Sequence, residues 1–483
     1  MMDQQERFVL LLKELLAGID QGDFDNIDSI PEKYTYEHLL SLYVFADALD
    51  NGIRLYEQLY DIAMACGKKR IHEKIKNNEK IKVAFLAISA AEWSAGELYH
   101  MLAQNEAIEC YLVTAPLIDR DEESRKDTYR QTCQYFEQNG YDIRGGYDDA
   151  ADHIRTWDEL GGRPDVVIHL TPWYGSIPKE FQITSLPLNC INCYVPYGIY
   201  VADSLDKSYA VNFIYNKEFV NMMWRVYADS KRNLEGYRKY ERLHGKNVIF
   251  SGYIKMDQFY SLKEYSEEEI RKVWKIPEDK RQEDVKKVII APHHSFLGYG
   301  GIQYSTFAKN AWFLLYLAKK YRDKVSFIFK PHPNLRLRAV EAGVFSSYEE
   351  YDAYLEEWNR LSNAKVVQET SYLDIFATSD GMIMDSASFL AEYLYVDKPL
   401  LFLRGKGQAF NELGQVLLEG HYLKPGEDYW GIEKFLLDVI LKGEDSRKGI
   451  RESIWEEELD YMKINKCKAC EFIYQDICSL LTR

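Results

Sequence analysis

The first 80 residues have an apolar spacing that is typical of helices. Six apolar residues, Phe8, Leu11, Leu12, Leu15, Leu16 and Ile19, recur with a period of about 3.6 residues. Two further helical patterns follow around residues 36–49 and 52–65. Short apolar runs then alternate with helical patterns, and the runs are residues 83–88, 110–114, 166–170 and 191–195. This alternation predicts parallel strands that are joined by helices.

The alternation starts again after a charged stretch, residues 225–246, which we expect to be helical. The predicted strands of this second part are residues 248–250, 288–291, 325–329, 381–384 and 399–403. The sequence therefore predicts an α/β protein with two Rossmann-like lobes that face a cleft, preceded by an N-terminal helical segment. The expected boundaries are 1–80 for the helical region, 81–240 for the first lobe, 241–450 for the second lobe, and 451–483 for a C-terminal helix that packs back on the first lobe.

Composition and charge narrow the class of protein. The chain has 483 residues and a net charge of −16, from 60 Lys+Arg and 76 Asp+Glu, and a pI near 5.3. General nucleic-acid binding needs net positive charge facing the phosphates, so we expect no nucleic-acid partner. No apolar run approaches the ~18 residues of a membrane span, and the N-terminus is not that of a signal peptide. We expect a cytoplasmic, multi-domain protein whose eight cysteines form no disulfide framework.

Polar side chains follow three successive strands of the second part. The first strand runs into Pro292-His293-His294-Ser295 and the glycine-rich residues 298–301, the next into Lys330-Pro331-His332-Pro333, and the third into Asp385-Ser386-Ala387-Ser388 and a helix that carries Glu392. Taken singly, each side chain has an ordinary structural explanation, such as a helix N-cap for Ser386. Together, at three strand ends, these side chains suit a pyrophosphate. Cations, hydroxyls and helix N–H groups are the groups that bind such an anion. Glu392 lies one helical turn beyond Ser388 and could accept from ribose hydroxyls.

The same residues carry a resemblance to a known family. Ala291-Pro292-His293-His294, Lys330-Pro331-His332-Pro333 and Asp380–Ser388, with Gly252-Tyr253 upstream, look like the teichoic-acid CDP-glycerol glycerophosphotransferase family. The tail of the last motif, Glu392-Tyr393 followed by Lys398-Pro399, is similar too. The resemblance covers residues 247–403 well, is fainter over 83–198 and is absent before residue 80.

The resemblance implies a GT-B-like fold, with the nucleotide in the C-terminal lobe and the acceptor against the N-terminal one. It also implies transfer of a glycerol phosphate or related polyol phosphate from a CDP-activated donor to a hydroxyl of a surface polymer or glycan, with release of CMP. The catalytic residues that we infer are His332, His293 and Tyr197. The inferred donor-binding residues are His294, Lys330, Asp385, Ser386, Ser388 and Glu392. We expect no metal and no cofactor besides the donor substrate, because Asp380 and Asp385 are too thin a signal for Mg²⁺.

One departure from the family concerns the catalytic base. Family members commonly have Trp-His-Gly at the end of the first lobe, whereas this chain has Pro196-Tyr197-Gly198. A tyrosine with a pKa near ~10 is a weak base at neutral pH. Either Tyr197 only positions the acceptor, or His169, Glu92 or Asp203 takes the proton. The first histidine pair also stands where many relatives have Thr-Trp-Arg.

Other interpretations remain open. The same strand ends would suit a GT-B glycosyltransferase that uses a nucleotide-activated sugar, or a non-catalytic binding protein of the same fold. A basic run over residues 68–82 would suit an anionic membrane surface or a polyanionic acceptor; the alternative is a solvated helix face. A lipid-linked acceptor would place the chain peripherally on the inner membrane face. Cys190 with Cys193, and Cys467 with Cys470, have zinc-ligand spacing, although buried free thiols explain them as well.

Overall fold

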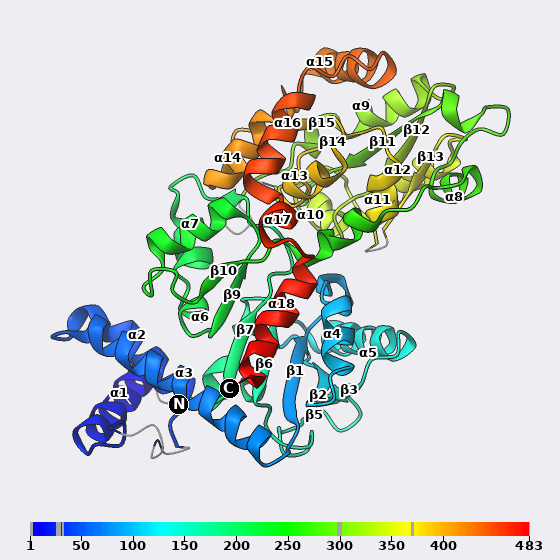
Figure 1. The fold of residues 1–483 in the computed structure, drawn as a ribbon. Coiled ribbons are helices and arrows are strands. Elements are labelled where there is room, and N and C mark those ends of the chain that lie inside the picture. Colours follow the sequence, from blue (N-terminus) through cyan, green and yellow to red (C-terminus); the bar gives the residue numbers. More distant parts are fainter. Residues whose placement is uncertain (1–2, 26–29, 31–32, 297–301, 369–370, 483) are drawn as a thin grey trace. The chain divides into compact units, whose positions relative to one another are not determined.

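The computed structural model describes residues 3–25, 30, 33–296, 302–368 and 371–482 (Figure 1). These residues form two compact units. Unit 1 comprises Met1–Tyr197, Ile214–Lys255 and Tyr461–Arg483, and unit 2 comprises Gly198–Phe213 and Met256–Asp460. The C-terminal residues therefore belong to the same unit as the N-terminal ones.

Unit 1 is built on a seven-stranded parallel sheet. Its strands are β1 (Ile81–Ala87), β2 (Ile108–Thr114), β3 (Ile143–Gly145), β6 (Val166–His169), β7 (Ile191–Tyr194), β9 (Arg225–Ala228) and β10 (Val248–Phe250). The strand order is β10-β9-β7-β6-β1-β2-β3, with every pair parallel. The order reverses direction between β1 and β6. A small antiparallel pair, β4 (Tyr147–Asp148) and β5 (His153–Ile154), lies outside this sheet.

The helices of unit 1 come from the first half of the chain and from its C-terminal end. They are α1 (Gln4–Asp20), α2 (Tyr36–Phe45), α3 (Gly52–Lys76), α4 (Gly96–Ala103), α5 (Glu122–Gln138), α6 (Glu218–Asn221), α7 (Lys231–Tyr240), α17 (Tyr461–Asn465) and α18 (Ala469–Cys478). Helix α18, red in Figure 1, packs against α4, and the short turn after it packs against α3. Helix α1 packs against α2.

Buried polar contacts attach α2 and α3 to the sheet. The Tyr36 hydroxyl donates to the carbonyl of Cys190 at 2.8 Å, and the Tyr60 hydroxyl donates to that of Met223 at 2.7 Å. Asp165, which is fully buried, accepts from Arg70 at 3.1 Å and Lys74 at 2.8 Å. It also accepts from the backbone N–H of Lys82 at 2.9 Å. The carboxylate is satisfied by three donors, as a buried charge requires.

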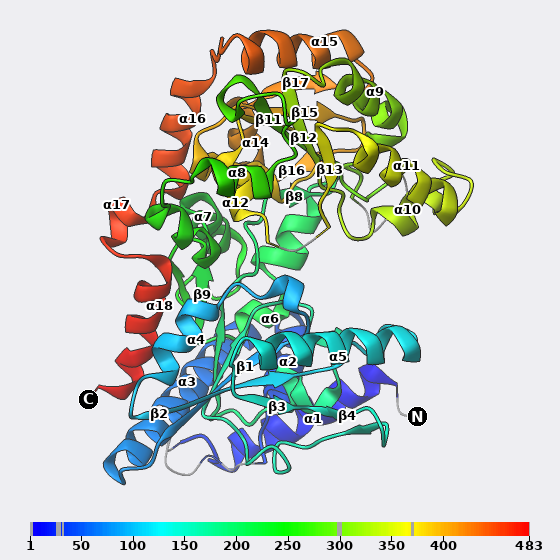
Figure 2. The same cartoon turned by 90° about the vertical axis from the view of Figure 1, so that its right-hand side faces the viewer.

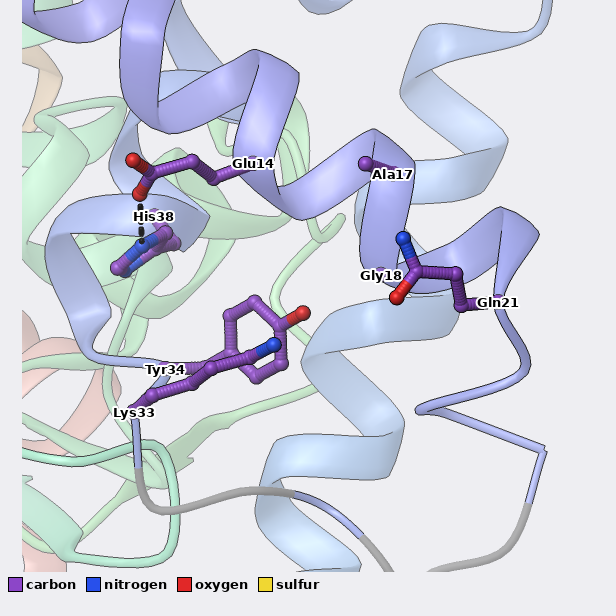
Figure 3. Close-up of a pocket in the computed structure, with 7 residues that line it drawn as sticks. All are labelled: Glu14, Ala17, Gly18, Gln21, Lys33, Tyr34 and His38. Carbon is purple, nitrogen blue, oxygen red and sulfur yellow. Dashed lines mark ion pairs between the residues drawn. The ribbon is translucent and has the colours of Figure 1, made fainter.

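A pocket of about 440 Å³ lies beside α1 in this N-terminal region (Figure 3). Its lining includes the ion pair between Glu14 and His38, whose atoms lie 3.4 Å apart. Burial lowers the pKa of His38. The Tyr34 ring approaches Gly18 so closely that a Cβ there would overlap its hydroxyl. Glycine at this position therefore permits the contact.

Unit 2 is built on a six-stranded parallel sheet (Figure 2). Its strands are β11 (Lys286–Ala291), β12 (Val325–Phe329), β13 (Ala364–Val366), β14 (Gly381–Met384), β15 (Leu400–Arg404) and β17 (Tyr422–Pro425), in the order β13-β12-β11-β14-β15-β17. Counted along the chain this order is 3-2-1-4-5-6, the doubly-wound arrangement of dinucleotide-binding domains. The pair β8 (Ala202–Asp203) and β16 (Ala409–Phe410) forms a separate antiparallel ladder.

Helices cover the sheet of unit 2. They are α8 (Glu267–Val273), α9 (Phe307–Lys320), α10 (Leu335–Glu341), α11 (Tyr348–Arg360), α12 (Leu373–Thr378), α13 (Phe389–Glu392), α14 (Glu412–Glu419), α15 (Tyr429–Lys434) and α16 (Lys448–Ile454). One core joins β11, β12, α9 and α11, with Phe329 stacked on Trp358 at 5.0 Å between ring centroids. In the described residues, no helix is both long and apolar enough to cross a membrane.

The predicted α/β class and the N-terminal helical segment are confirmed, but two element predictions are wrong. Residues 225–246 are not all helical, because β9 (Arg225–Ala228) precedes α7. Residues 248–250 do not start the second sheet; as β10 they pair with β9 at the edge of the first. The apolar run of β9 is only three residues long, Val226–Ala228, and charged residues flank it. A run this short shows no periodicity that would distinguish a strand from a helix.

Candidate functional site

Three of the strands in unit 2 bring the predicted polar side chains together. Strands β12, β11 and β14 are neighbours and run parallel, so their carboxyl ends meet at one edge of the sheet. The strand order reverses between β11 and β14, and ligands of such sheets bind in the crevice at this reversal. The segments that begin at Pro292 and Asp385 flank that position.

Three imidazoles form a cluster at this edge. The ring centroids of His293 and His294 lie 4.4 Å apart, those of His294 and His332 lie 3.9 Å apart, and those of His293 and His332 lie 5.3 Å apart. His293 and His294 are buried, and His332 is partly exposed. Candidate ligand atoms of all three lie within 4.8 Å of one another. The rings of His294 and His332 are tilted by 31° to each other.

Backbone donors select the tautomer of two of these rings. The N–H of Ser295 donates to Nδ1 of His293 at 3.1 Å, and the N–H of Asn334 donates to Nδ1 of His332 at 3.1 Å. A backbone N–H cannot accept, so each Nδ1 is the acceptor and the proton of the neutral ring lies on Nε2. Both histidines therefore have an Nε2–H that can donate to an anionic ligand.

Burial keeps the cluster neutral at neutral pH. It lowers the pKa of His293 well below its usual range, that of His294 to about 4 and that of His332 to about 3. Positive neighbours act in the same direction: Arg338 on His294, and Lys330 on His332. A bound diphosphate would oppose these effects, because a nearby negative charge favours the protonated ring.

Asp385 binds two places in the chain after β11, one at His293 and one at Thr306. Its carboxylate accepts from the N–H of His293 at 2.6 Å and from the hydroxyl of Thr306 at 2.8 Å, and it also accepts from the N–H of Thr306. Burial raises the pKa of Asp385 to about 6, although these donors oppose the shift. The structure thus gives Asp385 a positioning role, and its contact with a donor substrate stays a prediction.

The other predicted donor-binding side chains differ in exposure. Lys330 is buried, with its ammonium 5.8 Å from the centroid of the Tyr372 ring. The Tyr372 hydroxyl donates to Glu392, which is also buried. Ser386 is buried at the end of β14, and Ser388 is exposed immediately before α13. The glycine-rich residues 298–301 lie outside the described residues. The six predicted donor-binding residues all follow neighbouring strands of unit 2.

Sequence reasoning missed Thr306 and Tyr372. Thr306 contacts Asp385 across 79 residues, and Tyr372 contacts Glu392 across 20. Neither stands in a recognisable motif, so no signal in the sequence singled them out. Only the fold brings them to the site.

The candidates for the base lie at separate places. Tyr197 follows β7 in unit 1, where its N–H donates to the carbonyl of Leu170 at 3.1 Å. His169 is buried against Phe219 and bonds to Asn192 at 2.9 Å, and burial lowers its pKa to about 4. Asp203 belongs to unit 2 and accepts from the N–H of Ala210 at 3.0 Å.

The remaining candidate, Glu92, lies in the turn Ala90–Glu92 after β1. Burial raises the pKa of its carboxyl to about 7.

The strand-end cluster lies where parallel sheets of this strand order bind ligands. Residues 209–415, which include the whole cluster, match the family of CDP-glycerol:poly(glycerophosphate) glycerophosphotransferases. This match covers less than half of the chain, and it falls on the residues that carry the resemblance seen in the sequence. No curated protein matches the chain significantly.

Solved structures support the fold. A histidine-to-asparagine variant of the wall teichoic acid polymerase TagF, soaked with CDPG, is similar with a TM-score of 0.51 and 13% identity over 88% of this chain and 92% of that one. The same variant without the soak gives a TM-score of 0.51 and 14% identity over 88% and 94%. The S. aureus MnaA–UDP co-structure gives a TM-score of 0.48 and 15% identity over 83% and 97%.

Proposed function

We propose that the chain transfers glycerol phosphate, or a related polyol phosphate, from a CDP-activated donor to a hydroxyl of a surface polymer, with release of CMP. The observation that carries this proposal is the coincidence of the family match at residues 209–415 with the three-strand cluster at the reversal of the unit 2 sheet. Parallel sheets bind nucleotides at this place, and the matched residues supply its donors.

The chemistry of the cluster fits a diphosphate. The Nε2–H groups of His293 and His332 would donate to phosphate oxygens, and Lys330 would supply positive charge. Ser386 and Ser388 add hydroxyl donors. Charge develops on the bridging oxygen as CMP leaves, and fixed donors placed around that oxygen stabilise the transition state without reorganisation. In this tautomer the two histidines act as hydrogen-bond donors and not as bases.

The test is CMP release from CDP-glycerol and CDP-ribitol in the presence of a polymer acceptor, with UDP-sugars and CMP-sugars as controls. We expect release that depends on both the acceptor and one CDP-polyol. His332→Ala should lower kcat/KM by about 10²–10³-fold, the usual effect of removing one such donor. The matched control is His153→Ala, which removes an exposed imidazole paired with Glu159 in unit 1.

Several outcomes would contradict the proposal. Release from a sugar nucleotide alone would replace the polyol donor by a sugar donor. A His332→Ala enzyme with an unchanged rate would remove the assigned role of this residue. Donor binding without turnover by any acceptor fraction would favour a non-catalytic binding protein.

We further propose that the acceptor is lipid-linked and that the chain lies peripherally on the inner membrane face. The support is the second half of α3 and the turn that follows it, where Lys68, Lys76 and Lys80 are exposed. Arg70 and Lys74 of the same run are engaged with Asp165, so only part of the run is available. Each exposed lysine would contribute about 1 kcal/mol near an anionic surface.

Co-sedimentation with vesicles tests this placement. We expect binding to vesicles that contain anionic lipid, little binding to neutral vesicles, and loss of binding at high salt. The triple exchange of Lys68, Lys76 and Lys80 for glutamine should abolish it. Equal binding to neutral and anionic vesicles would contradict the proposal.

A further inference from the structure

The edge of unit 2 that holds the imidazole cluster has a further strand end, to which neither the sequence motifs nor the proposed function assigns a role. Strand β15 lies next to β14 and runs parallel to it, with Phe402 as the register partner of Met384. Ser386 and Arg404 each stand two residues beyond this pair. Because adjacent strands of a sheet lie roughly 4.8 Å apart, the end of β15 brings Arg404 beside the segment that follows β14.

The residues at the end of β15 are basic and rich in glycine, with the sequence Arg404-Gly405-Lys406-Gly407. Glycine permits a close approach to the chain after β11, because a Cβ at Gly405 would lie 3.3 Å from the side chain of Thr306. The amide of Gln408 then donates to the carbonyl of Tyr304 at 2.7 Å. The segment after β15 is therefore attached to the loop immediately before α9, which also borders the imidazole cluster.

A chain of ring contacts joins Arg404 to the imidazole cluster. The guanidinium carbon of Arg404 lies 5.2 Å from the centroid of the Phe410 ring. That ring lies 5.3 Å from the ring of Tyr304, and the Tyr304 ring lies 5.6 Å from that of His293, measured between centroids. Two aromatic rings thus connect the guanidinium with an imidazole of the cluster, and all four residues belong to unit 2.

The guanidinium of Arg404 has no carboxylate partner in the described part of the chain. Its Nη1 is buried there without a hydrogen-bond partner. Burial lowers the pKa of the group, and the neighbour that opposes this shift is Tyr304 rather than an acidic residue. The buried Arg451 of the same unit is instead paired, with Asp445 at 2.7 Å and Asp397 at 3.2 Å. Because desolvation of an unpaired charge is costly, the position of Arg404 suits an anion from outside the chain.

We propose that Arg404 is a further donor-binding residue, whose guanidinium binds the diphosphate of the CDP-activated donor; this assignment rests on the proposed function above. A guanidinium presents a planar fork of N–H donors that matches the oxygens of a phosphate. Ser386, which the proposed function places at the same diphosphate, stands at the same level on the neighbouring strand. A fixed positive charge at this place also stabilises the charge that develops on the departing CMP.

The alternative is a packing role, in which the guanidinium only covers the Phe410 ring. The two roles predict opposite effects on stability. Replacement of a side chain that only packs should lower the melting temperature. Replacement of a partly buried charge that waits for a ligand should leave the melting temperature unchanged or raise it, because an uncompensated desolvation cost is removed.

The decisive experiment measures the Kd of CDP-glycerol and of CDP by calorimetric titration of the full chain, with Arg404→Gln, Arg404→Lys and wild type. Arg404→Gln should raise both Kd values by about 10–100-fold, because one charge-assisted contact to the diphosphate is lost. Arg404→Lys should recover part of the affinity, since it keeps the charge and loses the fork. The matched control is Arg322→Gln, which removes an exposed arginine of the same unit and should leave both Kd values unchanged.

Thermal melting of the same variants without ligand separates binding from packing. Arg404→Gln should melt at the wild-type temperature or above it. A CDP-glycerol Kd within about threefold of the wild-type value would overturn the assignment while leaving the proposed function intact. Weaker binding together with a melting temperature lower by about 4 °C or more would overturn it in favour of packing. A wild-type chain that binds neither CDP-glycerol nor CDP would instead overturn the proposed function itself, and the role of Arg404 with it.

Discussion

Asp385 holds the segments of the proposed donor site that contain His293 and Thr306, and its removal makes a sharp test. Asp385→Ala takes the acceptor away from two buried backbone N–H groups, those of His293 and Thr306. A buried donor that loses its partner costs about 1–3 kcal/mol, so the two amides together cost about 2–6 kcal/mol. The Thr306 hydroxyl adds little because it can rotate toward another acceptor.

The pH dependence of this loss has a definite sign. Burial raises the pKa of Asp385 from 3.8 to about 6 in the folded chain. The folded state therefore loses stability as pH rises from about 4 to about 6, where the carboxyl ionises more readily in the unfolded chain. Asp385→Ala has no such loss. Its destabilisation relative to wild type should consequently be larger at pH 5 than at pH 8, by about 1–2 kcal/mol.

Hydrogen exchange followed by mass spectrometry measures the effect locally. Peptides that contain His293 and Thr306 should exchange faster in Asp385→Ala, and urea unfolding should give the free energies at the two pH values. The control is Asp352→Ala, an exposed carboxylate paired with Arg336, which should change the free energy of unfolding by less than about 0.5 kcal/mol. A loss below about 1 kcal/mol at pH 5, or one that grows with pH, would refute the reasoning.

Two further predictions concern unit 1. Gly252 has φ +82°, and a Cβ there would overlap the Tyr461 ring, so Gly252→Ala should lower the free energy of unfolding by at least about 2 kcal/mol. Gly343→Ala, with φ +70° and open space around it, isolates the backbone strain and should cost about 1 kcal/mol; equal losses would contradict the clash. Burial raises the pKa of Glu92 from 4.5 to about 7 in the folded chain. The wild type therefore loses stability as the pH rises from about 4.5 to about 7. In denaturant titrations Glu92→Gln should be about 2–3 kcal/mol more stable than wild type at pH 8 and equal to it at pH 4, and a lack of any gain at pH 8 would refute the burial argument.

The grouping of the strand-end residues in the proposed donor site was predictable from local sequence. Strands that end in polar residues place those residues at one edge of a parallel sheet, whatever the details of packing. His293, Lys330 and Asp385 each follow an apolar run directly, so their proximity followed from the strand prediction alone. The family resemblance rested on the same motifs, which lie inside the matched residues 209–415.

The protonation states were not predictable in this way. The sequence named His293 and His332 as catalytic residues but did not indicate their charge, whereas burial and backbone donors make them neutral rings with Nε2–H groups. Such states depend on which groups surround a side chain in three dimensions. The same holds for Arg70 and Lys74, whose charges the buried Asp165 engages although it lies about 90 residues away.

The sequence by itself determined the class of the protein: two successive sets of parallel strands, the polar strand ends of the second, and the family that those motifs resemble. These follow from periodicity and from contacts within a few residues. The tertiary structure alone decided that β10 is the edge strand of the first sheet and that Asp385 holds the segments after β11. It also decided that Oε2 of Glu92 is buried. The physical reason is that strand pairing, burial and the resulting pKa values depend on residues distant in sequence, whose meeting no local pattern records.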